Sequence, residues 1–303
     1  MIDAKDAVLR ARKHGKVIPA FNIPYLPMMK PVLEAIVAEN AVAMAQVCRI
    51  EWEKFESVSL EAVAKEYRQY ADDRHTLLHL DHIPVLDEDW QRVEYLPLIE
   101  RAIDAGYQSV MIDASRLPFE ENVEATKKVA ELAHQANIPC EAELGAVMGH
   151  ESTEPIPYET IFAEKRGFTD IGESKLFVEK SECDWLSVAA GSIHGAIAEN
   201  IRHQKKPEAR LDVEHIQAIY DAVQIPLVLH GGSGINRDCI RAAMEAGIAK
   251  INVGTEIRQC YEAAIEQDKA DIAKAQEAVF VCTRNILKNH LLVSGSRSLL
   301  YGE

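Results

Sequence analysis

The chain has 303 residues, of which 48% are hydrophobic, and it carries a formal net charge of −15. This length and apolar content allow a large hydrophobic core, and α/β barrels commonly reach this size as one domain. The negative charge argues against a general binder of nucleic acid or of anionic membranes, because such binding depends on clustered positive charge. It does not exclude an anionic small molecule, since a local site can differ from the net charge.

The cysteines and the amino terminus indicate a soluble protein in a reducing compartment. The six cysteines are scattered without a CxxC pair, which is typical of reduced thiols. Residues 1–6 carry charges where a signal peptide needs an apolar run. No stretch approaches the roughly 18 apolar residues of a membrane span. We therefore expect a cytoplasmic protein with no membrane partner.

Short apolar runs alternate with helix-periodic segments along almost the whole chain. The runs predict eight strands covered on both faces, as parallel strands are: residues 17–21, 41–47, 76–80, 109–112, 140–144, 185–189, 227–229 and 250–253. Helical patterns lie between them: residues 31–39, 60–72, 96–105, 122–135, 175–180, 213–223 and 238–246.

Eight strand–helix units predict a TIM barrel that spans residues 1–303 as a single domain. A doubly wound open sheet is the alternative, but the turn after the first strand has no GxGxxG motif. Residues 256–292 form a further helical pattern, which predicts additional C-terminal helices and a subunit contact. We therefore expect a homodimer or a homotetramer. Residues 150–168 show no clear period and are a candidate mobile lid.

Three histidines occupy matching positions at or just beyond the ends of strands. His82 follows Asp81, His194 precedes Gly195, and His230 opens a glycine-rich turn. A catalytic zinc site commonly has three protein ligands and an open position. Any one of these histidines alone could be structural, but their shared placement favours one metal site.

The strand ends of a TIM barrel converge on one face, and here they are rich in polar residues. They supply imidazoles and carboxylates, which favour zinc or a related divalent transition metal over magnesium or calcium. The residues at these ends are Asn22, Gln46, Asp81, His82, Asp113, Glu143, His194, His230 and Asn252.

Asp81 is adjacent to a predicted ligand, where a general acid or base is needed. The alternative is that its carboxylate orients a histidine N–H group. We favour the catalytic role, chiefly because of the family resemblance described below.

The turn Gly231, Gly232 and Ser233 precedes a helix and resembles an anion cradle, because glycines let backbone N–H groups approach a phosphate. Asn252 and Thr255 follow the eighth strand. The loops after strands seven and eight are the usual phosphate site of this barrel.

Together these residues resemble the class II, metal-dependent ketose-bisphosphate aldolases, which include fructose- and tagatose-bisphosphate aldolases. The matching motifs occur in order over nearly the whole chain: residues 19–22, 78–82, 109–115, 121–123, 141–145, 190–195, 229–234 and 250–253.

The resemblance implies a role for each candidate site residue. His82, His194 and His230 would hold a catalytic zinc ion, and Glu143 could join its ligands. Asp81 would move the proton of the C4 hydroxyl, and Glu151 would transfer a proton at C3. The dihydroxyacetone phosphate portion would contact the remaining positions, with a monovalent cation possible beside it: Gly195, Gly231, Ser233, Asn252 and Thr255.

The loops that face the substrate depart from the family pattern. Ala196-Ile197 follows Gly195 where an aromatic residue and a lysine are usual, and Cys48 stands where a serine is usual. Our first hypothesis is an aldolase that cleaves a phosphorylated ketose to dihydroxyacetone phosphate and an aldehyde through a zinc-stabilised enediolate. The altered loops suggest two alternatives, an aldolase or an epimerase of another sugar phosphate or sugar acid. A third is a non-catalytic partner subunit of an aldolase.

Overall fold

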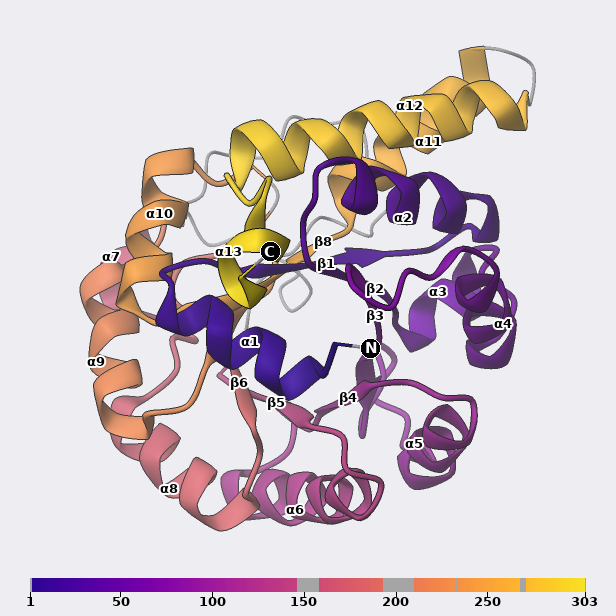
Figure 1. The fold of residues 1–303 in the computed structure, drawn as a ribbon. Coiled ribbons are helices and arrows are strands. Elements are labelled where there is room, and N and C mark those ends of the chain that lie inside the picture. Colours follow the sequence, from indigo (N-terminus) through magenta and orange to yellow (C-terminus); the bar gives the residue numbers. More distant parts are fainter. Residues whose placement is uncertain (1, 146–157, 193–209, 233, 268–270, 303) are drawn as a thin grey trace.

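Eight parallel strands close into a barrel in chain order, from β1 to β8 (Figure 1). The computed structural model describes residues 2–145, 158–192, 210–232, 234–267 and 271–302. The strands are β1 Ile18–Asn22, β2 Ala43–Val47, β3 Thr76–Pro84, β4 Ser109–Asp113, β5 Cys140–Leu144, β6 Trp185–Val188, β7 Leu227–Leu229 and β8 Ile248–Val253. The barrel closes through pairing of β1 with β8. This is a TIM barrel, as the sequence predicts.

Helices surround the barrel wall. They are α1 Ala4–Lys13, α2 Met29–Ala38, α3 Arg49–Lys54, α4 Leu60–Tyr70, α5 Tyr95–Asp104, α6 Phe119–Gln135, α7 Tyr158–Glu164, α8 Ile171–Ser181, α9 Val213–Val223, α10 Arg237–Ala246, α11 Thr255–Gln267, α12 Ile272–Asn285 and α13 Ser296–Tyr301. Among the described residues, no helix has both the length and the apolar character needed to cross a bilayer.

The barrel interior is divided into an apolar end and a polar end. Side chains alternate along a strand, so every second residue faces the interior. Near the start of the strands, the interior holds an apolar cluster of Ile18, Met44, Leu77, Trp185 and Val228. Nearer the strand ends it holds charged and polar side chains instead. The site is therefore built at one end of the barrel.

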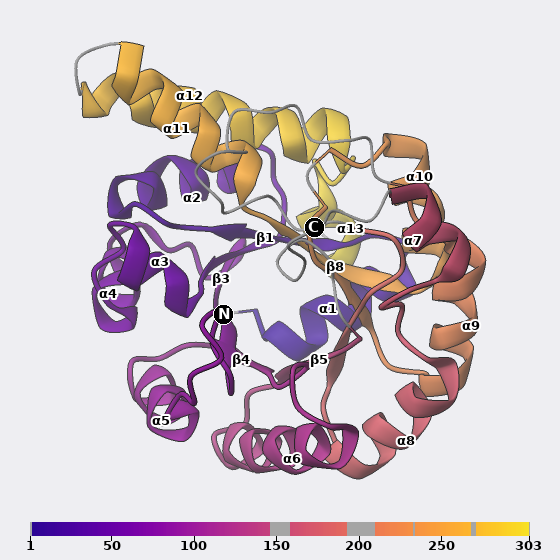
Figure 2. The same ribbon diagram turned by 180° about the vertical axis from the view of Figure 1, so that it is seen from behind.

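Helix α1 closes the apolar end. Its buried face is Ala4, Ala7, Val8 and Ala11, which belong to the same interior cluster. The side chain of Asp3 caps the helix by accepting a hydrogen bond from the backbone N–H of Asp6. Figure 1 shows α1 in front of the barrel, and Figure 2 shows it behind, so the mouth faces the viewer in Figure 2.

The predicted C-terminal helix pair is present, and the structure adds helices that the sequence pattern did not indicate. α11 and α12 pack against each other and project beyond the ring of helices in both views (Figures 1 and 2). The sequence pattern did not predict α1 or the short helix α3. Residues 150–157 of the candidate mobile lid lie outside the described residues, and the later part of that stretch contains α7.

Replacement of Trp185 tests the apolar interior. Trp185 is fully buried, so Trp185→Ala leaves a cavity and should lower the free energy of unfolding by about 3–5 kcal/mol. Urea denaturation measures the loss. Trp90 is 60% exposed, and Trp90→Ala should change stability by no more than about 0.5 kcal/mol. Equal losses for the two variants would contradict this account of the interior.

Candidate active site

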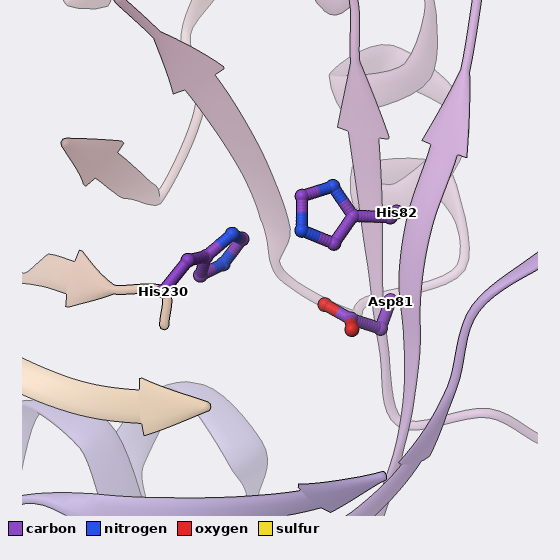
Figure 3. A group of neighbouring side chains, drawn as sticks. All are labelled: Asp81, His82 and His230. Atoms are coloured by element: carbon purple, nitrogen blue, oxygen red, sulfur yellow. The ribbon is translucent and has the colours of Figure 1, made fainter. Parts of the chain in front are cut away.

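The polar strand ends meet at the mouth of the barrel. Asp81 and His82 come from β3, and His230 follows β7 on the opposite wall (Figure 3). One nitrogen or oxygen atom from each of these residues lies within 4.8 Å of the others. The imidazole rings of His82 and His230 are 4.4 Å apart and inclined at 65°. The structure therefore brings together three of the predicted site residues.

A bulge in β3 lets two consecutive residues reach the same site. Leu80 pairs with Val110 and Ile83 with Ile112, so two residues of β3 stand opposite one residue of β4. His82 has a φ of +30°, outside the usual strand region. Without the bulge, consecutive side chains would point to opposite faces.

His82 and His230 each contact carboxylates. Nδ1 of His82 lies 3.2 Å from Asp113 Oδ2. Nε2 of His230 lies 2.9 Å from Glu141 Oε1, and its Nδ1 lies 3.1 Å from Glu143 Oε2. These contacts fix both ring orientations at the polar end of the barrel.

The electrostatics of the two rings favour a cation. Burial opposes protonation of His82, but the charge of Asp81 and the hydrogen bond with Asp113 raise its pKa to about 10. Burial and the neighbouring His82 oppose protonation of His230, yet its two glutamate partners raise its pKa above the ordinary value. Four carboxylates lie here: Asp81, Asp113, Glu141 and Glu143. A divalent cation would offset this negative charge and compete with protons for the rings, so the donors suit a metal ion.

The Asp81 carboxylate is held by three side-chain amides. Its Oδ1 accepts from Asn252 Nδ2 at 2.9 Å, and its Oδ2 accepts from Asn22 Nδ2 at 3.0 Å and from Gln46 Nε2 at 3.1 Å. Burial acts to raise the pKa of Asp81, but the charges of His82 and other neighbouring cationic groups hold it below its ordinary value. Asp81 is therefore an oriented, ionised carboxylate.

Glu51 lies beside this arrangement and was missed by the sequence reasoning. Its side chain is buried, and Oε2 accepts from the backbone N–H of Cys48 at 2.9 Å and from Asn22 Nδ2 at 3.4 Å. Burial raises the pKa of Glu51 to about 8, with a further contribution from Asp81. The sequence signal for Glu51 was its position three residues after Cys48, a potential helix N-cap.

Three further buried polar residues, His79, Glu141 and Lys250, were not assigned to the site from the sequence. Each precedes a predicted site residue by two positions, so alternation places it deeper on the same inward face. Burial and Lys250 lower the pKa of His79 to about 3, so its ring is neutral. That alternation is the signal that could have found all three.

The predicted phosphate-binding residues are only partly described. Gly231 has a φ of +69°, which favours glycine, and a Cβ on Gly232 would approach Ile251 to 2.7 Å. A side chain at position 232 would therefore collide with β8, which is one reason for a glycine there. Thr255 begins α11, as expected for a strand–helix turn. Four predicted site residues lie outside the described residues: Glu151, His194, Gly195 and Ser233.

The closed parallel barrel with these donors at its mouth defines a TIM-barrel enzyme. A family model described as fructose-bisphosphate aldolase class-II matches residues 2–296. The chain belongs to the class II fructose-bisphosphate aldolase family and is a lyase.

Solved structures agree with this assignment. The YdjI aldolase of Escherichia coli K12 is 26% identical over 97% of this chain and 98% of that chain, with a TM-score of 0.77. A putative fructose-1,6-biphosphate aldolase from Coccidioides immitis is 24% identical over 98% of both chains, also with a TM-score of 0.77. Fructose-bisphosphate aldolase from Campylobacter jejuni is 18% identical over 97% and 96%, with a TM-score of 0.73. The last two likenesses show the fold alone.

The raised pKa of Glu51 predicts a dependence of stability on pH. Since the folded pKa of about 8 exceeds the ordinary value of 4.5, the stability that Glu51 contributes is fully present below pH 4.5 and is lost as pH rises through 8. Glu51→Gln keeps an acceptor for Cys48 and removes this titration. Its free energy of unfolding should fall less than that of the wild type between pH 5 and pH 8.5. Urea denaturation at each pH, with exposed Glu34→Gln as control, makes the comparison. Parallel curves for wild type and Glu51→Gln would contradict it.

Proposed function

We propose that the protein reversibly cleaves a phosphorylated ketose to dihydroxyacetone phosphate and an aldehyde, with a zinc ion or a related divalent transition metal. The observation that carries the proposal is the convergence of Asp81, His82 and His230 at the barrel mouth. Family membership supports the reaction class and a sugar phosphate substrate.

His82 and His230 would hold the metal, together with His194, and Glu143 could join them. Nδ1 of His82 faces the Asp113 carboxylate, so Nε2 would be its ligand atom. When bound, the metal would act as a Lewis acid that polarises the ketone and stabilises negative charge left on the substrate. The imidazole and carboxylate donors favour zinc over an ion that prefers all-oxygen ligands.

Asp81 would accept the proton of the C4 hydroxyl. As that proton leaves, the C4 oxygen becomes the aldehyde carbonyl, the C3–C4 bond breaks, and the electron pair remains on C3. The three amides fix the direction of the Asp81 carboxylate, and the neighbouring cationic groups keep it ionised. Glu151 would supply the proton that C3 takes up after the bond has broken.

The phosphate of the substrate would lie at the ends of β7 and β8. The positive φ of Gly231 and the start of α11 at Thr255 fit an anion cradle at this edge. We assign Gly195, Gly232, Ser233 and Asn252 to the same region, with a monovalent cation possible beside the phosphate. The side-chain amide of Asn252 already contacts Asp81 and Lys250, so its part would be to connect the two regions.

We also infer self-association through the C-terminal helix pair. α12 exposes Ile272 and Val281, which are 50% and 56% exposed. Apolar side chains on a projecting helix suit a contact with a second copy, giving a homodimer or a homotetramer.

The reaction is tested by a retro-aldol screen of ketose monophosphates and bisphosphates, with and without a chelator. At least one ketose should release dihydroxyacetone phosphate, and chelation should abolish release until zinc is restored. Metal analysis of the purified protein accompanies the assay. Loss of ketose without aldehyde would favour the epimerase alternative. No conversion by metal-loaded protein would overturn the proposal and favour a non-catalytic partner subunit.

Replacement of Asp81 tests the base. Asp81→Asn should lower kcat by about 10²- to 10⁴-fold, because the amide cannot accept the hydroxyl proton. Metal content should remain that of the wild type. Exposed Asp104→Asn serves as the control and should retain full activity. If Asp81→Asn kept wild-type kcat, the base would have to be another residue.

A further inference from the structure

Lys250 is a charged side chain with no exposure to solvent, in the middle of β8. Burial of a charged group is unfavourable unless the group is paired and hydrogen-bonded. An apolar residue would fill the position more simply. Its partners therefore need to explain why an ammonium group stands there.

Lys250 contacts two residues inside the barrel. Its Nζ lies 2.9 Å from Glu141 Oε2 and donates a hydrogen bond to Asn252 Oδ1 at 2.7 Å. β5 and β8 are not neighbours in the sheet, so the contact with Glu141 crosses the interior. The ion pair thus joins two non-adjacent strands across the interior, beneath the candidate active site.

On one side, the pair leads to a proposed metal ligand. Glu141 Oε1 lies 2.9 Å from His230 Nε2. A carboxylate oxygen accepts, so Nε2 carries a hydrogen. Nδ1 faces Glu143, itself a proposed ligand, at 3.1 Å, and is the nitrogen that would bind a metal. Lys250 holds Oε2 of Glu141, which keeps Oε1 facing Nε2 and leaves Nδ1 as the ligand nitrogen of His230.

On the other side, the pair leads to the proposed base. Lys250 only donates, so the Asn252 atom facing it must be the carbonyl oxygen. The Asn252 amide nitrogen then necessarily faces Asp81, where it donates to Oδ1 at 2.9 Å. One ammonium group thereby determines the direction of the hydrogen bond that holds the base.

A second potential metal group lies at this level, formed by His79, Asp81 and Glu141. The Glu141 carboxylate of this group already contacts the Lys250 ammonium. The Lys250 ammonium therefore supplies the positive charge at this inner position. Because it is part of the chain, it cannot exchange with ions in solution. An exchangeable ion would bind nearer the mouth, between His82 and His230.

We propose that Lys250 and Glu141 are positioning residues, whose ion pair sets the direction of the polar contacts that link His230 to Asp81. The inference rests on the proposed roles of His230 as ligand and Asp81 as base. It predicts that the pair acts on metal affinity and on the chemical step, beyond any effect on stability.

The test compares two variants with a matched control. Lys250→Met/Glu141→Gln removes the pair without leaving a lone charge, and Glu141→Gln alone keeps the side-chain shape. The control is Arg284→Met/Glu39→Gln, which removes another ion pair, in which Glu39 is buried and Arg284 Nε lies 2.6 Å from Glu39 Oε1. The three measurements are the zinc dissociation constant by chelator competition, the visible spectrum of the cobalt-substituted protein, and kcat and KM for the cleaved ketose.

Both active-site variants should bind zinc about 10- to 100-fold more weakly. They should also alter the cobalt spectrum and lower kcat more than they change KM. The control should alter none of these. Wild-type zinc affinity, spectrum and kcat in folded Glu141→Gln would overturn the inference, whether or not the double variant folds.

A fourth measurement separates this inference from the proposed function. Nitrogen-15 NMR of metal-free, histidine-labelled protein reports whether Nε2 of His230 is protonated. It should be protonated in the wild type and partly unprotonated in Glu141→Gln, because the amide can donate as well as accept. The protonation of Nε2 can be measured even if the wild type binds no zinc. Absence of zinc binding would contradict the proposed function and leave the inference about the hydrogen-bond direction standing. An unchanged Nε2 signal would overturn the inference.

Discussion

Excess negative charge inside the barrel is the constraint on which the rest of the site depends. Among the described residues, Asp81, Asp113, Glu141 and Glu143 lie near the imidazoles of His79, His82 and His230 and the ammonium group of Lys250. In water such charges are well solvated, but inside a barrel they require partners. Amides hold Asp81, Lys250 contacts Glu141, and the histidines face the remaining carboxylates. A divalent cation would complete this balance at the mouth, where substrate would enter.

The two ends of the interior separate the residues that stabilise the barrel from those proposed to carry out the reaction. The apolar end, with Trp185 and Met44 covered by α1, can be packed for stability without affecting the mouth. Conversely, the polar end holds groups that packing alone would not favour. This division is common to TIM barrels, whose reactive residues gather at the carboxyl ends of the strands. Here it occurs within single strands: β3 has buried Leu77 near its start and Asp81 and His82 toward its end.

Much of the fold could be predicted from the sequence because strands buried on both faces are nearly continuous apolar runs. The limits of β5 and β7 agree with the pattern, whereas β3 continues to Pro84 because the bulge carries polar residues into the ladder. Helix α1 was missed because half of its residues are charged, with a buried face of three alanines and one valine. For the site, strand ends located Asp81, His82 and His230. Lys250 and Glu141 were not found, because their meaning depends on a contact between strands that are not adjacent in the sheet.

The bulge in β3 has a consequence for how the site can vary. Asp81 and His82 are joined by one peptide bond, so no loop movement can change the spacing between their backbones. His230 stands on the opposite wall, and its distance from them depends on non-covalent contacts that can adjust. Covalent geometry thus sets the spacing of Asp81 and His82, whereas the packing of the whole barrel sets their distance from His230.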